Sequence, residues 1–137
     1  MRYYAVIDTN VLVSALLKWT SVPGRVGGHV LTGNIIPLLN DEILREYNEV
    51  LHRPKFKFPR EAVDVFLQGI ARRGVYVEAG DSDYILPDPK DAVFYEVVME
   101  HRKEHDSYLV TGNLKHFPVH TFVVTPREML SIIEENS

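Results

Sequence analysis

The chain has 137 residues, of which 45% are hydrophobic and 25% are charged, as expected of one ordinary globular domain spanning residues 1–137. Its 15 Lys and Arg against 19 Asp and Glu give a net charge of −4, which argues against wrapping duplex DNA by bulk attraction. The absence of cysteine excludes disulfides and thiolate metal sites, so any metal must be held by oxygen or histidine.

Short apolar runs alternate with helical patterns along the chain. Short uninterrupted runs are typical of strands buried on both faces, as in a parallel sheet, and their alternation with helices predicts βαβ units with helices on both faces of one sheet. In chain order the patterns predict a strand (3–7), two helices (9–17 and 22–31), a strand (35–39), two helices (41–51 and 60–73), a strand (75–77), a helix (89–103), two strands (108–110 and 122–124) and a helix (126–134).

Hydropathy also predicts where the protein acts. The apolar run before Asp8 is too short for a signal peptide, and nothing approaches the roughly 20 apolar residues of a membrane span. We therefore expect a cytoplasmic protein that does not enter a membrane.

Four oxygen-bearing side chains fall where ligands bind in such folds, outside the carboxyl ends of the strands. Asp8 directly follows the first strand, and Asn113 follows the run "YLVTG". Asp91 opens the helix that leads into that second strand. Glu46 borders the apolar stripe of the 41–51 helix and faces inward. We expect these four side chains to converge on one edge of the sheet.

Converging carboxylates repel one another, and burying even one of them unpaired is costly. A hard divalent cation such as Mg²⁺ resolves this conflict, because it prefers oxygen ligands and binds through a few carboxylates together with a substrate phosphate. Such an ion can lower the pKa of a bound water and neutralise charge as a phosphodiester is cleaved. The acids therefore indicate metal-assisted hydrolysis that requires no side-chain nucleophile.

Each acid also has a structural interpretation. The sequence "DPKD" (88–91) has the pattern of a helix start, so Asp88 is interpreted as an N-cap, and Asp91 could gain roughly 0.3–1 kcal/mol from the helix dipole. Asp8 could cap the 9–17 helix, although Thr9 or Asn10 could do the same. The remaining structural interpretations are an ion pair of Glu46 with Arg53 or Lys55, a turn at Asn113 and a strand-end hydroxyl at Thr111.

The joint order of these features is more specific than any one of them. The stretches "VIDTNVLVSALL", "LREYNEVLHRPKF", "LPDPKDAVFYEVV" and "YLVTGNLKHFP" contain Asp8, Glu46, Asp91 and Asn113 respectively. In this order they resemble the PIN-domain family, ribonucleases that include the VapC-like toxins of toxin–antitoxin pairs. The resemblance spans nearly the whole chain.

That resemblance implies a three-layer α/β/α sandwich with a central parallel sheet of about five strands. It also implies an acidic pocket that binds Mg²⁺ or Mn²⁺ and metal-dependent cleavage of single-stranded RNA. Asp8, Glu46 and Asp91 match the three principal acids of the family, and Asn10 and Thr111 match positions that support the metal or its waters. Further implied partners are an antitoxin protein and copies of the same chain, as a homodimer or a higher homo-oligomer.

One position departs from the family pattern. The fourth acidic position is often Asp, and here it is Asn113, which offers a carbonyl oxygen without charge. Three carboxylates suffice for one cation, whereas a second would bind weakly without a substrate phosphate. We expect Asp8 and Asp91 to ligate the metal and Glu46 to complete its shell or to orient the attacking water. We expect Asn113 and Thr111 to position the water or the phosphate. Lys115, His116 and the basic stretch 52–60 are expected to guide RNA.

Two other functions fit parts of the pattern. An inert pocket on a partner-binding PIN-like module is consistent with Asn113. Phosphoryl chemistry on Asp8, as in haloacid-dehalogenase-like phosphatases or receiver domains, fits an Asp after a strand. However, Asn10 stands where the phosphatases need a second Asp. The receiver domains need paired acids at the first strand, and only Asp8 is present there.

Overall fold

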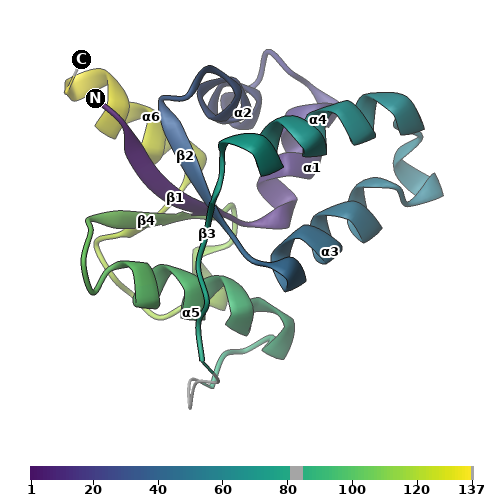
Figure 1. The fold of residues 1–137 in the computed structure, drawn as a ribbon. Coiled ribbons are helices and arrows are strands. Elements are labelled where there is room, and N and C mark those ends of the chain that lie inside the picture. Colours follow the sequence, from purple (N-terminus) through teal and green to yellow (C-terminus); the bar gives the residue numbers. More distant parts are fainter. Residues whose placement is uncertain (81–84, 137) are drawn as a thin grey trace.

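The computed structural model describes residues 1–80 and 85–136, and these form an α/β/α fold around a five-stranded parallel sheet (Figure 1). The strand order is β3-β2-β1-β4-β5, and every neighbouring pair is parallel. The predicted fold class is therefore confirmed. The strands are β1 (Tyr3–Ile7), β2 (Ile35–Leu39), β3 (Val75–Tyr76), β4 (Ser107–Val110) and β5 (Val123–Val124), and the helices are α1 (Thr9–Leu17), α2 (Val22–Thr32), α3 (Asp41–Leu51), α4 (Arg60–Arg73), α5 (Ala92–His101) and α6 (Pro126–Glu135).

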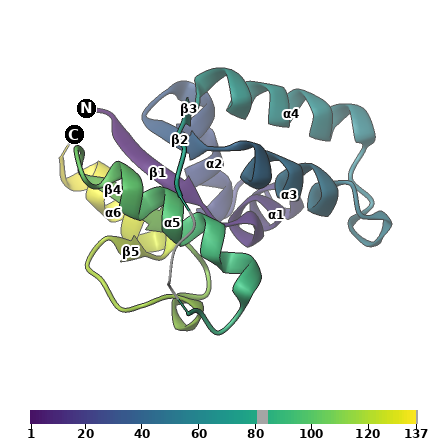
Figure 2. The ribbon, with the colours of Figure 1, turned by 60° about the horizontal axis from the view of Figure 1, so that its bottom comes forward.

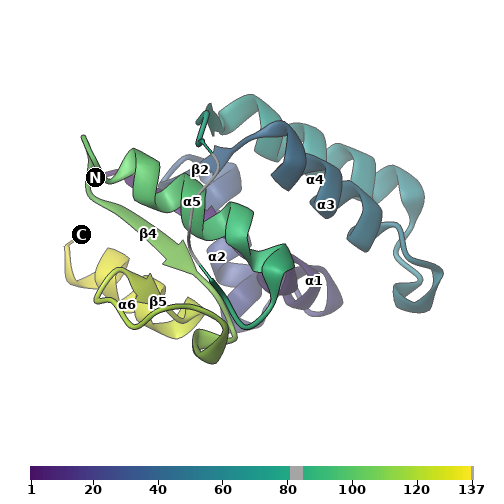
Figure 3. The same ribbon diagram turned by 90° about the horizontal axis from the view of Figure 1, so that it is seen from below.

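The helices cover both faces of the sheet. In Figure 1, α5 lies on one side of the sheet and α1 and α2 lie on the other, and the view from below in Figure 3 agrees. α5 packs against β1, β2 and β4, whereas α2 packs against β2, α1, α4 and α6. Figure 2 shows α3 and α4 lying side by side at one end of the molecule. Within the described residues, no helix is long and apolar enough to cross a membrane.

β1 occupies the centre of the sheet, where its apolar run is buried on both faces. It pairs with β2 on one side and with β4 on the other, with Ile7 opposite Val110. The backbone N–H of Asp8 then donates to the carbonyl of Val110 at 2.9 Å. This register places Asp8 beside Thr111, although more than a hundred residues separate them along the chain.

Most predicted element bounds differ from the observed ones by no more than one residue, and the 89–103 segment is the exception. Its first three residues form a 3₁₀ turn, η2 (Pro89–Asp91), and α5 begins at Ala92 and ends at His101. The Asp91 N–H donates to the Asp88 carbonyl three residues earlier at 3.0 Å, which is the hydrogen bond of a 3₁₀ turn. The side chain of Asp88 accepts a hydrogen bond from the N–H of Lys90 at 3.0 Å. Asp88 is thus the N-cap that the sequence predicts, and Asp91 stands at the junction of η2 and α5.

The glycines that interrupt the predicted 22–31 helix have different surroundings. A Cβ at Gly24 would lie 2.0 Å from the backbone oxygen of Trp19, so only glycine allows this approach. A Cβ at Gly27 would lie 3.1 Å from the Trp19 ring. At Gly28 no described atom lies within 4 Å of such a Cβ. The N-terminal turn of α2 therefore needs glycine for packing, whereas Gly28 only weakens the helix.

We expect Gly24→Ala to lower the free energy of unfolding by about 1–3 kcal/mol, because the added methyl group overpacks a rigid backbone contact. Gly28→Ala is the matched control on the same helix, and it should raise the free energy of unfolding by about 0.5–1 kcal/mol. Urea denaturation followed by circular dichroism measures both changes. Equal effects of the two substitutions would contradict the packing of Trp19 on Gly24.

Candidate active site

Asp8 is a buried carboxyl group at the carboxyl end of the central strand. Asp8 is the N-cap residue of α1 by position, but its side chain makes no capping hydrogen bond. Instead, Oγ1 of Thr111 donates to its Oδ2 at 2.8 Å. Burial raises the pKa of Asp8. This effect outweighs the hydrogen bond from Thr111, which lowers the pKa, and the smaller lowering effects of the backbone N–H of Asn10 and of His116. The capping interpretation therefore does not explain Asp8.

Glu46 is half-buried on α3 and faces the end of β1, as its position in the apolar stripe predicts. The hydroxyl group of Thr9 donates to its Oε2. The structural interpretation of Glu46 as an ion-pair partner of Arg53 is wrong, because Arg53 pairs with Glu49 instead. Burial raises the pKa of Glu46, and the negative charge of Asp8 raises it further.

Tyr47, the next residue of α3, fixes the helix against the sheet. Its ring is fully buried, and its hydroxyl group donates to the carbonyl of Ile7, the last residue of β1. Burial raises the pKa of Tyr47 well above the usual value for tyrosine, and the charges of Asp8 and Glu46 add to this effect. The phenol therefore stays a neutral hydrogen-bond donor that holds α3 beside the end of β1.

Asp91 is the third acid, and it is only 9% exposed. Nδ1 of His116 lies 3.1 Å from its Oδ2, and the side-chain nitrogen of Asn113 lies 2.9 Å from Nε2 of the same ring. Burial raises the pKa of Asp91 to about 6, with further contributions from the charges of Asp8 and Asp88, and His116 opposes the shift.

Thr111 connects these groups at the end of β4. Its Oγ1 donates to Asp8, and it also accepts a hydrogen bond from the backbone N–H of Asn113 at 3.0 Å. Asn10 lies on the first turn of α1, where its side chain is exposed. The six sequence-predicted site residues therefore come from the ends of β1 and β4, from α1, from α3 and from the start of α5.

The three acids lie within electrostatic reach of one another, because the charge of Asp8 raises the pKa of both Glu46 and Asp91. Their oxygens point to three different partners, Thr111, Thr9 and His116. Among residues 1–80 and 85–136, no group of three or more His, Asp or Glu side chains is already arranged to hold a metal ion. The donor chemistry nevertheless fits a hard divalent cation, which would relieve the mutual repulsion of these carboxylates.

Comparison with protein-family models matches residues 4–115 to the PIN domain. The chain belongs to the PIN-domain family. No curated protein and no solved structure matched the chain. The matched region begins in β1 and ends within the turn η3 (Leu114–His116), so it contains all six candidate residues. PIN domains are generally nucleases that act on RNA and usually use divalent metals.

Thr9 and His116 contact the acids of this PIN domain in ways that the sequence does not predict. Thr9 was considered only as a helix cap, and its hydroxyl instead holds Glu46. Its position between two candidate residues in "DTN" was the available signal. The sequence predicts that His116 guides RNA, and in the structure its ring also bonds directly to Asp91. Lys115 lies on η3 with an exposed side chain.

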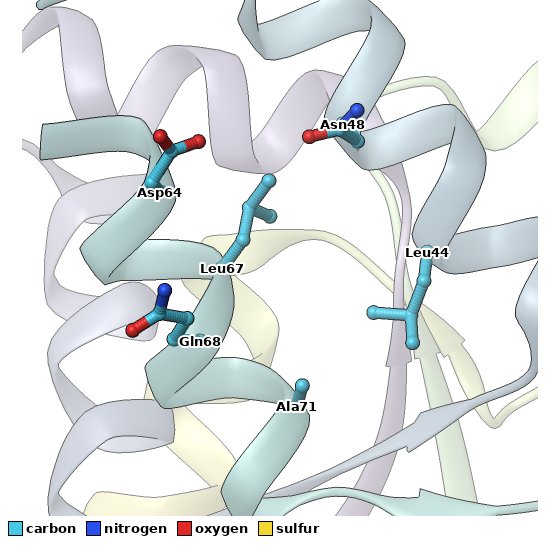
Figure 4. Close-up of a pocket in the computed structure, with 6 residues that line it drawn as sticks. All are labelled: Leu44, Asn48, Asp64, Leu67, Gln68 and Ala71. Carbon is cyan, nitrogen blue, oxygen red and sulfur yellow. The ribbon is translucent and has the colours of Figure 1, made fainter. Parts of the chain in front are cut away.

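The PIN domain also has a cavity beside α3 that does not belong to this site. Figure 4 shows it between α3 and α4, with a volume of about 300 Å³. His52, the first residue of the basic stretch, lies 2.9 Å from Asp64 on α4, so His52 contacts α4 rather than the acids. The cavity contains none of the six candidate residues, and it is lined by Leu44, Asn48, Asp64, Leu67, Gln68 and Ala71.

Proposed function

We propose that this PIN domain is a metal-dependent endoribonuclease that cleaves single-stranded RNA at the edge formed by Asp8, Glu46 and Asp91. The observation that carries the proposal is that these three carboxyl groups, from separate segments, all have pKa values raised by burial, and that Asp8 repels both Glu46 and Asp91. Structural acids are usually paired with basic groups that lower the pKa, as Arg53 does for Glu49. Acids whose pKa values are raised by burial and by a neighbouring acid are instead typical of functional sites.

In this proposal, Asp8 and Asp91 hold Mg²⁺ or Mn²⁺, and Glu46 completes the shell or orients the attacking water. When bound, such a cation supplies the charge that stabilises a phosphodiester during cleavage. Thr111 holds one oxygen of Asp8, and Thr9 holds one oxygen of Glu46. Each hydroxyl group thereby fixes the orientation of one carboxylate.

The contacts of His116 give a role to Asn113. The side-chain nitrogen of Asn113 lies against Nε2 of the imidazole, and Nδ1 of the same ring lies against Asp91. Asn113 thus orients Asp91 through His116. We propose that Asn10, Thr111 and Asn113 position the substrate or the water rather than hold the metal.

Calorimetric titration with Mn²⁺ tests the metal site directly. We expect one site in the unaltered protein, and Glu46→Gln should weaken binding at least about tenfold, because even outer partners of metal ligands change affinity by 10–100-fold. Glu42→Gln is the matched control, since Glu42 lies one turn earlier on α3 and is exposed. Absence of binding, or equal affinity in both variants, would contradict the metal site.

A second candidate function is an inert module that binds a partner protein or RNA. The observation that favours it is Asn113, which stands at the fourth acidic position and is engaged with His116. The same titration separates the two candidates, because an inert module would show no Mn²⁺ site or one indifferent to Glu46→Gln.

We further propose that residues 1–137 form one domain, that it acts in the cytoplasm, and that it is the toxin of a toxin–antitoxin pair. Its partners would be an antitoxin protein and further copies of the chain, as a homodimer or a higher homo-oligomer. The family resemblance supports the toxin role. Two helices offer surfaces for these partners, α2 and α4, and α4 carries the exposed Val65.

A further inference from the structure

A groove next to Glu46 contains three basic side chains in addition to its acids. It has a volume of about 410 Å³ and lies where α3 meets η2. Arg45 reaches it from α3, Arg53 from the segment that follows α3, and Lys90 from η2. Glu46 itself is part of its wall, so the groove is continuous with the candidate active site. A polyanion bound at the acids would therefore extend into a basic surface.

Arg53 follows the C-terminal end of α3, and Glu49 of that helix holds it in this groove. Its Nε and Nη2 lie 3.1 and 2.8 Å from the two carboxylate oxygens of Glu49, which is a bidentate pair. The side chains of Arg53 and Glu49 are 42% and 61% exposed. An exposed ion pair of this kind is weak, so another anion can replace Glu49.

A phosphate diester is the anion that best fits this position. The planar guanidinium group presents two parallel N–H donors, which match a phosphate as well as they match a carboxylate. Arg53 lies in extended backbone beyond the end of α3, and it shares the wall of the groove with Glu46. This position beside the acids suits the phosphate of a neighbouring nucleotide rather than the phosphate that is cleaved.

We infer that Arg53 exchanges Glu49 for a backbone phosphate of single-stranded RNA, so that this groove holds nucleotides flanking the cleavage site. The inference rests on the proposed function, because it assigns a substrate subsite to the same acidic edge. Glu49 then acts as an internal competitor that occupies Arg53 when no RNA is bound. Arg45 and Lys90 add positive charge along the same path.

The test measures binding of a fluorescent single-stranded RNA oligonucleotide without divalent metal, so that binding is separated from cleavage. We expect Arg53→Ala to weaken binding about threefold to tenfold and to reduce the slope of log affinity against log salt by about 0.7, the value for one phosphate contact. Glu49→Gln should strengthen binding by about twofold to fivefold, the range set by an exposed ion pair.

The double variant distinguishes competition from simple repulsion. If Glu49 acts by occupying Arg53, Glu49→Gln should gain nothing in an Arg53→Ala background. An equal gain in both backgrounds would show that Glu49 only repels RNA and would overturn the exchange. The matched controls are Arg25→Ala and Glu134→Gln, since these residues form a similarly exposed pair at 2.7 Å between α2 and α6. Neither control should change the salt slope.

This inference and the proposed function fail in different ways. Unchanged affinity of Arg53→Ala, or no RNA binding by the unaltered protein, overturns the phosphate subsite even if RNA is cleaved in Mg²⁺. Binding that depends on Arg53 without any metal-dependent cleavage supports the subsite and overturns the nuclease.

Discussion

Asp8→Asn is expected to abolish Mg²⁺-dependent cleavage of single-stranded RNA while leaving the fold intact. The amide keeps an oxygen that can accept the hydrogen bond from Thr111, so the end of β1 retains its contact with β4. It removes the negative charge that the proposed cation requires. We expect the cleavage rate to fall by more than about 100-fold, because even changes to the outer partners of metal ligands cost 10–100-fold.

A gel assay with a labelled RNA measures this rate, and thermal denaturation checks the fold. Asp106→Asn is the matched control, because Asp106 is an exposed residue that precedes β4, at the opposite end of that strand. The control should cleave RNA at the rate of the unaltered protein. Metal-dependent cleavage that persists in Asp8→Asn would remove Asp8 from the proposed mechanism.

The metal-free protein is expected to lose stability through Asp91 as the pH rises from about 4 to about 6. The usual pKa of this carboxyl group is 3.8, and burial together with Asp8 and Asp88 raises the pKa to about 6. Between these values the native state binds more protons than the unfolded state, so the free energy of unfolding falls with increasing pH. After allowance for solvent screening, the loss is on the order of 1–2 kcal/mol.

Urea denaturation at several pH values isolates this effect when the unaltered protein is compared with Asp91→Asn. The asparagine side chain does not titrate, so the variant should lack the loss between pH 4 and 6. Asp106→Asn should retain it. We also expect Mn²⁺ to stabilise the unaltered protein more at pH 7 than at pH 5, because protons compete with the cation. Parallel pH profiles for the unaltered protein and Asp91→Asn would refute the raised pKa.

The fold could be predicted largely from the sequence because its strands are buried on both faces. The runs that became β1 and β2 contain no charged residue, and the apolar positions of α3 recur with the period of a helix. The segment 89–103 was predicted less well. Its helix-start pattern is the same for a 3₁₀ turn and for an α-helix, and the backbone bond from the Asp91 N–H to the Asp88 carbonyl distinguishes them.

The candidate site could be predicted only in part, because chain position does not determine which neighbours pair. Arg53 lies just past the end of α3, which carries both Glu46 and Glu49, and the shorter sequence offset forms the ion pair. His116 and Asp91 are far apart in sequence and meet only because β4 and α5 are adjacent. Order along the chain therefore identifies the acids, while their hydrogen-bond partners depend on tertiary packing.

The central position of β1 has a consequence for synthesis on the ribosome. β1 is made first, together with Asp8 at its end. Thr111, at the end of β4, follows 103 residues after Asp8. A nascent chain therefore exposes its first acid long before the strand that orients it exists. On the proposed function, the messenger RNA being translated is protected from the growing polypeptide until nearly the whole sheet has emerged.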